Sequence, residues 1–155
     1  MLCMIRGNMK LFRKFRVVWR NNEHLRFLKM WKKGYSPLNF DADDPFEAFN
    51  IAIKLYVRFK NVEYRKSSSG RGFHFRVLDD KGDVLYLPSK EVYEIRKEIG
   101  DDKGRLFWDS VKLRYKKWRP ISVLFDSKNG KRASGWKKLD VIGIIEILKC
   151  SNLKI

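Results

Sequence analysis

Two aspartates, Asp41 and Asp43, stand two residues apart at the end of a segment that reads as a strand. Residues i and i+2 of a strand point to the same face of a sheet, so both carboxylates would be directed at one point. Like charges held so close repel unless a cation lies between them, and Mg²⁺ and Mn²⁺ prefer such oxygen ligands. The alternative is an acidic turn that only caps the next helix, a role that Asp44 alone can fill.

A second candidate site lies in the turn-forming run from Ser67 to Gly72, which contains Ser69, Gly70 and Arg71 and leads to His74. Serines and glycines between strands expose backbone N–H groups that can bind phosphate oxygens. Arg71 would add a planar, bidentate donor. The alternative is an ordinary hairpin connection followed by a packed histidine.

Two later acids are candidates for the same chemistry. Asp109 follows an aromatic segment, where a partly buried carboxylate needs a cation or hydrogen bonds. It could instead pair with a neighbouring base, namely Arg105, Lys112 or Arg114. Asp126 ends a strongly β-branched segment and competes with Asp109 for the role of third acid, although the turn that follows it also reads as a solvated hairpin tip.

These residues need a scaffold, and the sequence predicts an α+β domain with a mainly antiparallel sheet flanked by helices. Asp44, Pro45 and Glu47 are a strong helix-start signal. The predicted helices cover about 22–33, 45–59, 90–99 and 140–149, the third capped by Ser89 and the last by Asp140. The predicted strands cover about 12–19, 37–41, 62–66, 73–78, 84–87, 106–108 and 121–125, with a hairpin at 79–82.

The composition fits one folded domain of 155 residues, with a basic section at 1–35, a motif-bearing core at 36–131 and a C-terminal helix at 140–149. Lys and Arg number 35 against 18 Asp and Glu, giving a formal charge of +17. That excess predicts a polyanionic partner. No apolar run approaches the roughly 18–20 residues that span a bilayer, so we expect no membrane insertion. Two distant cysteines, Cys3 and Cys150, predict no disulfide framework and favour a cytoplasmic location.

Taken together, the four segments resemble the archaeo-eukaryotic primase superfamily, comprising small catalytic primase subunits and primase-polymerases. That family carries Asp-x-Asp, then Ser-Gly-x-x-Gly-x-His, then a third acid, then a basic Lys-x-Gly turn. Here the order is Asp41-Ala42-Asp43, Ser68 to His74, Asp109, and Lys128-Asn129-Gly130. The chain departs from the pattern at Ser69, where the family has glycine, and at Asp126, where it often has histidine.

The resemblance implies a primase-polymerase core of the RRM-like kind and a metal-dependent nucleotidyltransferase of DNA replication, in a compact form that would suit a plasmid or virus. Two Mg²⁺ or Mn²⁺ ions would be held by Asp41, Asp43 and Asp109, with Asp126 as competitor. The nucleoside triphosphate would be bound by Ser69, Gly70, Arg71, His74 and Lys128. Single-stranded DNA would be bound by Lys131, Arg132 and Trp136; Trp19, Trp31 and Trp118 are further candidates for base stacking.

Two other functions remain open from the sequence. The chain could be a non-catalytic, basic nucleic-acid-binding protein on a degenerate primase-like fold. It could also be a nucleic-acid- or ribosome-associated domain unrelated to primases, in which the acidic patch is only a helix cap.

Overall fold

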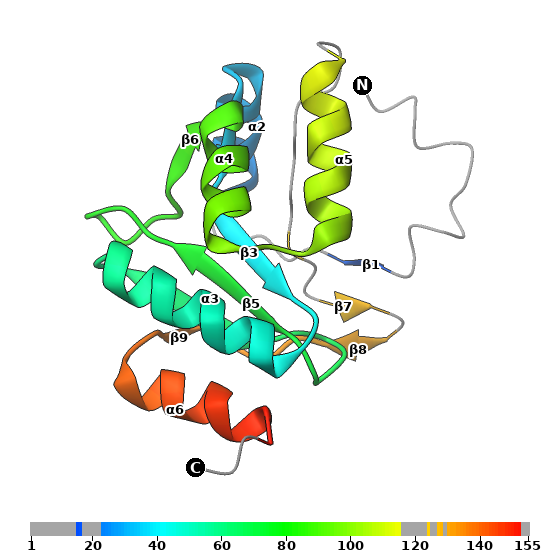
Figure 1. Cartoon of the computed structure of the whole chain (residues 1–155). Helices are drawn as coiled ribbons and strands as arrows, with labels where there is room; N and C mark the ends of the chain where they lie inside the picture. The colour runs from blue at the N-terminus through cyan, green and yellow to red at the C-terminus, as the bar shows by residue number, and fades with distance from the viewer. Residues whose placement is uncertain (1–14, 17–22, 116–123, 125–126, 129, 153–155) are drawn as a thin grey trace.

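A four-stranded antiparallel sheet lies at the centre of the molecule (Figure 1). The structure is a computed structural model, and it describes residues 15–16, 23–115, 124, 127–128 and 130–152. Its strand order is β3 (Asn39–Ala42), β5 (Phe73–Val77), β4 (Val62–Lys66) and β9 (Lys137–Lys138). Two smaller antiparallel sheets accompany it: β2 (Tyr35–Pro37) with β6 (Tyr86–Pro88), and β1 (Phe15–Arg16) with β7 (Ser127–Lys128) and β8 (Lys131–Arg132). The predicted α+β class is therefore confirmed.

One face of the central sheet is apolar because side chains alternate along each strand. A cross-strand row of Phe40, Phe75 and Tyr64 runs over this face. The row belongs to the buried core together with residues of α3 (Pro45–Arg58) and α6 (Val141–Cys150), two helices that pack side by side (Figure 1). Because these side chains face the two helices, the residues that alternate with them along the strands point to the opposite face of the sheet.

The cap of α3 is formed as predicted. The Asp44 side chain accepts hydrogen bonds from the N–H groups of Phe46, at 2.8 Å, and Glu47, at 3.1 Å, and Pro45 occupies the first turn. Two of the helix's orphan donors are thereby satisfied. Asp140 caps α6 in the same way, by accepting from Gly143 N–H at 2.8 Å.

Three further helices stand at the other end of the sheet (Figure 1): α2 (Glu23–Lys32), α4 (Ser89–Ile99) and α5 (Lys103–Arg114). Arg96 of α4 is 1% exposed and joins α4 and α5 to the strands. Its guanidinium donates to the carbonyl of Pro37, to the carbonyl and side chain of Asn39, and to Asp109 of α5, at 2.8–3.0 Å. A buried charge is tolerated when it is so fully paired.

The predicted strand at 106–108 is wrong, because these residues lie in α5. Asp102 caps the helix by accepting from Arg105 N–H at 2.8 Å. The consecutive apolar residues suggested a strand, but the ion pair of Asp109 with Arg96 fixes one helical face of the segment against α4. Tertiary pairing thus overrides the local pattern.

Other boundaries differ in smaller ways. Ser89 opens α4 rather than capping it, and its hydroxyl donates to Gly34 O at 2.9 Å. After the hairpin at 79–82, only Val84 pairs back, with Leu78, before the chain turns to join β2 as β6. Apart from Leu124, which is in no strand, the predicted strand at 121–125 lies outside the described residues.

We expect the change Arg96→Leu to lower the free energy of unfolding by about 3–5 kcal/mol, the range for breaking a buried ion pair from one side. Asp109, the Pro37 carbonyl and the Asn39 acceptors would each lose the hydrogen bond from Arg96. Urea denaturation measures the loss, and Arg58→Leu, at an exposed arginine of α3, is the control. A loss for Arg96→Leu no larger than the control's would contradict the structural role of Arg96.

Candidate functional site

The second face of the central sheet is polar and carries two cross-strand rows. The first row is Asp41, His74 and Arg65, on β3, β5 and β4 respectively. The second row is Asn39, Arg76 and Glu63, and Arg76 donates to Glu63 at 2.6–2.7 Å. The alternation that buries the phenylalanines on one face therefore gathers six hydrogen-bonding side chains on the other.

His74 is held in one orientation and is neutral. Arg65 Nε donates to His74 Nδ1 at 3.1 Å, so Nδ1 is the acceptor and Nε2 carries the proton. His74 Nε2 lies 3.6 Å from Asp41 Oδ1. Burial, aided by the positive charges of Arg65 and Arg105, lowers the pKa of His74 to about 3. The ring therefore presents an N–H donor on the side of Asp41.

Asp41 is the more accessible member of the pair, with a side chain 25% exposed against 7% for His74. Burial raises the pKa of Asp41 to about 6, and repulsion from Asp101, Asp43 and Asp102 adds to this effect against the attraction of Arg105. A carboxyl group with such a pKa changes its charge close to neutral pH. The neighbouring carboxylates contribute a negative potential at this position, although burial is the main cause of the raised pKa.

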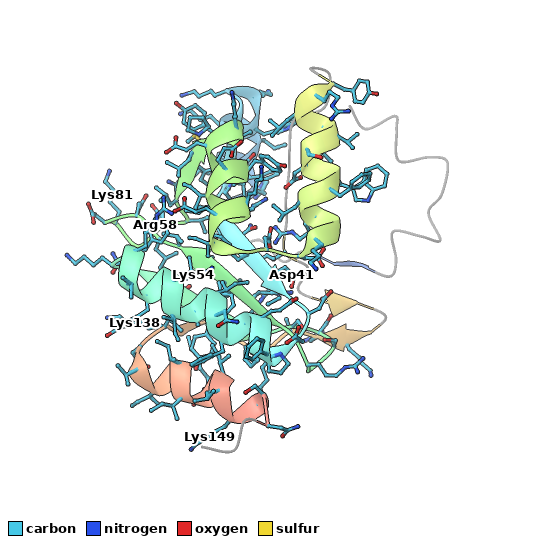
Figure 2. All side chains as sticks on the ribbon, viewed as in Figure 1. Asp41, Lys54, Arg58, Lys81, Lys138 and Lys149 are labelled. Carbon is cyan, nitrogen blue, oxygen red and sulfur yellow. The ribbon has the colours of Figure 1, made fainter. Side chains whose placement is uncertain are left out.

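Asp41 is positioned by the segment between α4 and α5, beside which Figure 2 shows it. β3 is an edge strand, and the Asp41 N–H donates to Asp101 Oδ1 at 2.7 Å instead of to another strand. Arg105 donates to the same Asp101 oxygen at 2.9 Å and to Asn39 at 2.6 Å. The Asp101 side chain is fully buried, and burial raises its pKa.

These positioning residues were missed as site residues by sequence reasoning. The acidic run around Asp101 was visible, but nothing local showed that it reaches the backbone of Asp41, 60 residues earlier in the chain. Arg65 is likewise an unremarkable base until the register of β4 on β5 places it opposite His74.

Asp43 does not share the strand geometry that was predicted for it. β3 ends at Ala42, and Asp43 lies in a bend and is exposed. It remains close enough to Asp41 to raise the pKa of that carboxyl. The two carboxylates are therefore electrostatic neighbours without being aligned by strand pleating.

The loop at 67–72 lies against the end of β3. A Cβ atom on Gly72 would lie 2.4 Å from the carbonyl oxygen of Ala42, so only glycine fits there. Gly70 adopts a positive φ of 76°. The N–H groups of Arg71 and Gly72 donate to Ser69 Oγ at 3.3 and 3.4 Å, and Gly70 N–H donates to Ser67 O at 3.0 Å. The loop therefore lies next to the segment of Asp41 and Asp43. These three N–H groups donate to acceptors within the loop.

Asp109 is not gathered with the other two acids. Asp109 is buried in α5, and its main partner is Arg96, which was not among the partners expected from the sequence. Lys112, which was expected, lies 3.8 Å from the Asp109 carboxylate. In the described part of the chain, no group of three or more His, Cys, Asp or Glu residues is placed to hold a metal ion. Asp126 lies outside the described residues.

The predicted nucleic-acid contacts are placed as follows. Lys131 and Arg132 are exposed on β8, and Lys128 belongs to β7. Trp136 is half-buried, and the guanidinium groups of Arg65 and Arg76 both lie 4.3 Å from its ring centre. Trp136 therefore contacts the same arginine that holds His74. Trp19 and Trp118 lie outside the described residues, and Trp31 is half-buried on α2.

The chain matches no protein-family model, no curated protein and no solved structure. Among the described helices, none combines the length and apolar character that crossing a membrane requires. The class of protein must therefore be inferred from the two rows of polar residues and from the motifs that contribute to them.

Asp41 and His74 should give opposite pH dependences of stability. Folded Asp41 keeps its proton up to a pKa of about 6, against 3.8 for an unperturbed aspartate, so its contribution to stability falls as the pH rises through that window. Folded His74 loses its proton near pH 3 against 6.5, so its contribution rises over the same range. Each slope reaches at most about 1.4 kcal/mol per pH unit.

We therefore expect Asp41→Asn to make stability rise more steeply between pH 4 and pH 6 than in the wild type, and His74→Gln to make it rise less or fall. Urea denaturation at several pH values in metal-free buffer measures both slopes. Asp80→Asn, in the exposed turn at 79–82, should leave the slope unchanged. If both site variants keep the wild-type slope of stability against pH, the pairing of Asp41 with His74 is contradicted.

Proposed function

We propose that this chain is a primase-like nucleotidyltransferase that uses a nucleoside triphosphate and a divalent metal ion on a single-stranded DNA template. The observation that carries the proposal is the register of β3 on β5, which puts Asp41 directly opposite His74. This pairing puts Asp41 of the Asp-x-Asp segment beside His74, the last residue of the segment from Ser68 that resembles the second motif of the family except at Ser69. Their proximity supports the family resemblance because sequence order alone does not require it.

The chemistry of the row suits a triphosphate. A neutral imidazole with its proton on Nε2 can donate to a phosphate oxygen, and Arg65 holds it in that tautomer. Arg65 and Arg105 supply positive charge nearby, as shown by their lowering of the pKa of His74. Exposed Arg71, on the neighbouring loop, can add a bidentate contact. Such fixed donors and charges stabilise negative charge that develops at phosphorus.

The acids suit one ion shared with the substrate. Mg²⁺ is commonly held by one or two carboxylates together with phosphate oxygens and water. Asp41 and Asp43 provide the two carboxylates. Burial is the main cause of the raised pKa of Asp41, and repulsion from Asp43 is a smaller contribution that a bound cation would relieve. When bound, the ion would supply Lewis-acid stabilisation of the transferring phosphoryl group. A second ion would need a further acid, because Asp109 is engaged by Arg96.

The second candidate function is single-stranded nucleic-acid binding without catalysis. It is favoured by the engagement of Asp109 with Arg96 and by the loop N–H groups that donate within the loop. The charge of +17 supports a polyanionic partner under either function. Only a transfer assay separates the two.

The test is incorporation of labelled ribo- and deoxynucleotides on primed and unprimed single-stranded DNA, with Mg²⁺ or Mn²⁺. Asp41→Asn and Asp43→Asn should each reduce transfer by at least about a hundredfold, a typical loss for a key transition-state contact. DNA affinity should change little, because other cations hold the strand. His74→Ala should raise KM for the nucleotide more than for the template. Asp80→Asn is the matched control.

Each outcome has a separate meaning. If the wild type transfers no nucleotide with either metal but binds single strands, the catalytic proposal is wrong and the binding function replaces it. If the wild type is active and the aspartate variants are equally active, the activity stands and the site assignment is wrong.

A further inference from the structure

Helix α5 is only weakly amphipathic, and its two neighbouring aromatic residues lie on the exposed side while two of its charged residues are turned inward. Its charged residues Arg105 and Asp109 face inward, where they pair with Asp101 and Arg96. Its exposed side includes Phe107 and Trp108, which are 60% and 61% exposed. A surface helix normally turns its apolar stripe to the core, so these adjacent exposed rings are a candidate contact surface.

The stripe has a regular helical spacing. Phe107, Trp108, Val111 and Tyr115 follow one another at intervals of one, three and four residues, which places them on one side of the helix. Tyr115, at the C-terminal cap, is 61% exposed. The rings of Phe107 and Trp108 meet edge to face, with centres 5.5 Å apart, and this contact holds both in place.

The charges beside the stripe are all positive. Lys103 and Arg114 are exposed, Lys112 is half-buried, and the single acid of α5, Asp109, is buried. The outward face of α5 therefore combines aromatic rings with cations and has no exposed carboxylate. Aromatic rings and arginine are also common in protein interfaces, but lysine is depleted there. The exposed Lys103 and the charge of +17 of the whole chain therefore favour a polyanionic occupant.

We propose that the outward face of α5 binds single-stranded nucleic acid by stacking unpaired bases on Phe107, Trp108 and Tyr115. Every base offers a π-face to an aromatic ring, while the phosphates complement Lys103 and Arg114. Trp108 and Tyr115 are seven residues apart, or about 10 Å along the helix axis, so the two rings can contact different bases.

This surface would provide the template-binding element of the proposed transferase, yet its binding needs neither metal nor triphosphate. It is separate from the polar face of the sheet, because the ion pairs of Asp109 and Arg105 lie between α5 and that face. Base stacking and nucleotide transfer can therefore fail independently.

The test is fluorescence anisotropy with a labelled oligothymidylate in metal-free buffer, repeated at several salt concentrations. Phe107→Ala and Trp108→Ala should each weaken binding roughly tenfold, within the range for loss of one stacked base. Their salt dependence should match that of the wild type, because phosphate contacts remain. Phe46→Ala, at a phenylalanine of α3 that is 54% exposed, is the matched control.

An abasic oligonucleotide of equal length identifies the contact. The wild type should bind it more weakly than the oligothymidylate, whereas the double variant of Phe107 and Trp108 should hardly distinguish the two. Unchanged affinity of the variants for oligothymidylate would overturn the proposal. If affinity is unchanged while the variants lose self-association in sedimentation, or lose binding to phosphatidylserine vesicles, the face is a protein or lipid surface instead.

Discussion

The buried guanidinium of Arg96 is the constraint on which the rest of the structure depends. It is 1% exposed and bonds to Pro37, Asn39 and Asp109, so it joins α4 to two strands and to α5. A buried charge without partners would be very unfavourable, so these elements can only assemble in an arrangement that satisfies it. The position of Asp101, and through it the backbone of Asp41, follows from that arrangement.

The same constraint shapes both candidate surfaces. Because the charges of α5 turn inward to Arg96 and Asp101, its aromatic residues are left facing solvent. Because apolar side chains of the central strands pack under α3 and α6, the opposite face carries the row of Asp41, His74 and Arg65. The polar face of the sheet offers fixed hydrogen-bond donors and the Asp41 carboxyl group with its raised pKa. The outward face of α5 offers aromatic rings and positively charged side chains. Together they suit a nucleotide and a strand.

Local patterns predicted the scaffold well where the physics is local. The cap at Asp44, the turn at 67–72 and the strands predicted at 62–66 and 73–78 depend on neighbouring residues, and the structure confirms them. The hydrogen bond from the Asp41 N–H to Asp101 and the ion pair of Asp109 with Arg96 depend on residues that are more distant in the sequence. Asp109 was proposed as a third metal ligand through the family resemblance. Its ion pair with Arg96, on the preceding helix, was not foreseen because the segment before Asp109 was read as a strand.

The measurement that most directly tests the account is ¹⁵N NMR of the imidazole rings, which is simple here because the chain has two histidines and His24→Gln leaves only His74. At pH 7 His74 should be neutral with its proton on Nε2 and Nδ1 accepting from Arg65. Adding a non-hydrolysable nucleoside triphosphate with Mg²⁺ should shift the Nε2 resonance far more than Nδ1. A charged ring, a proton on Nδ1, or no response to the nucleotide would contradict the proposed site.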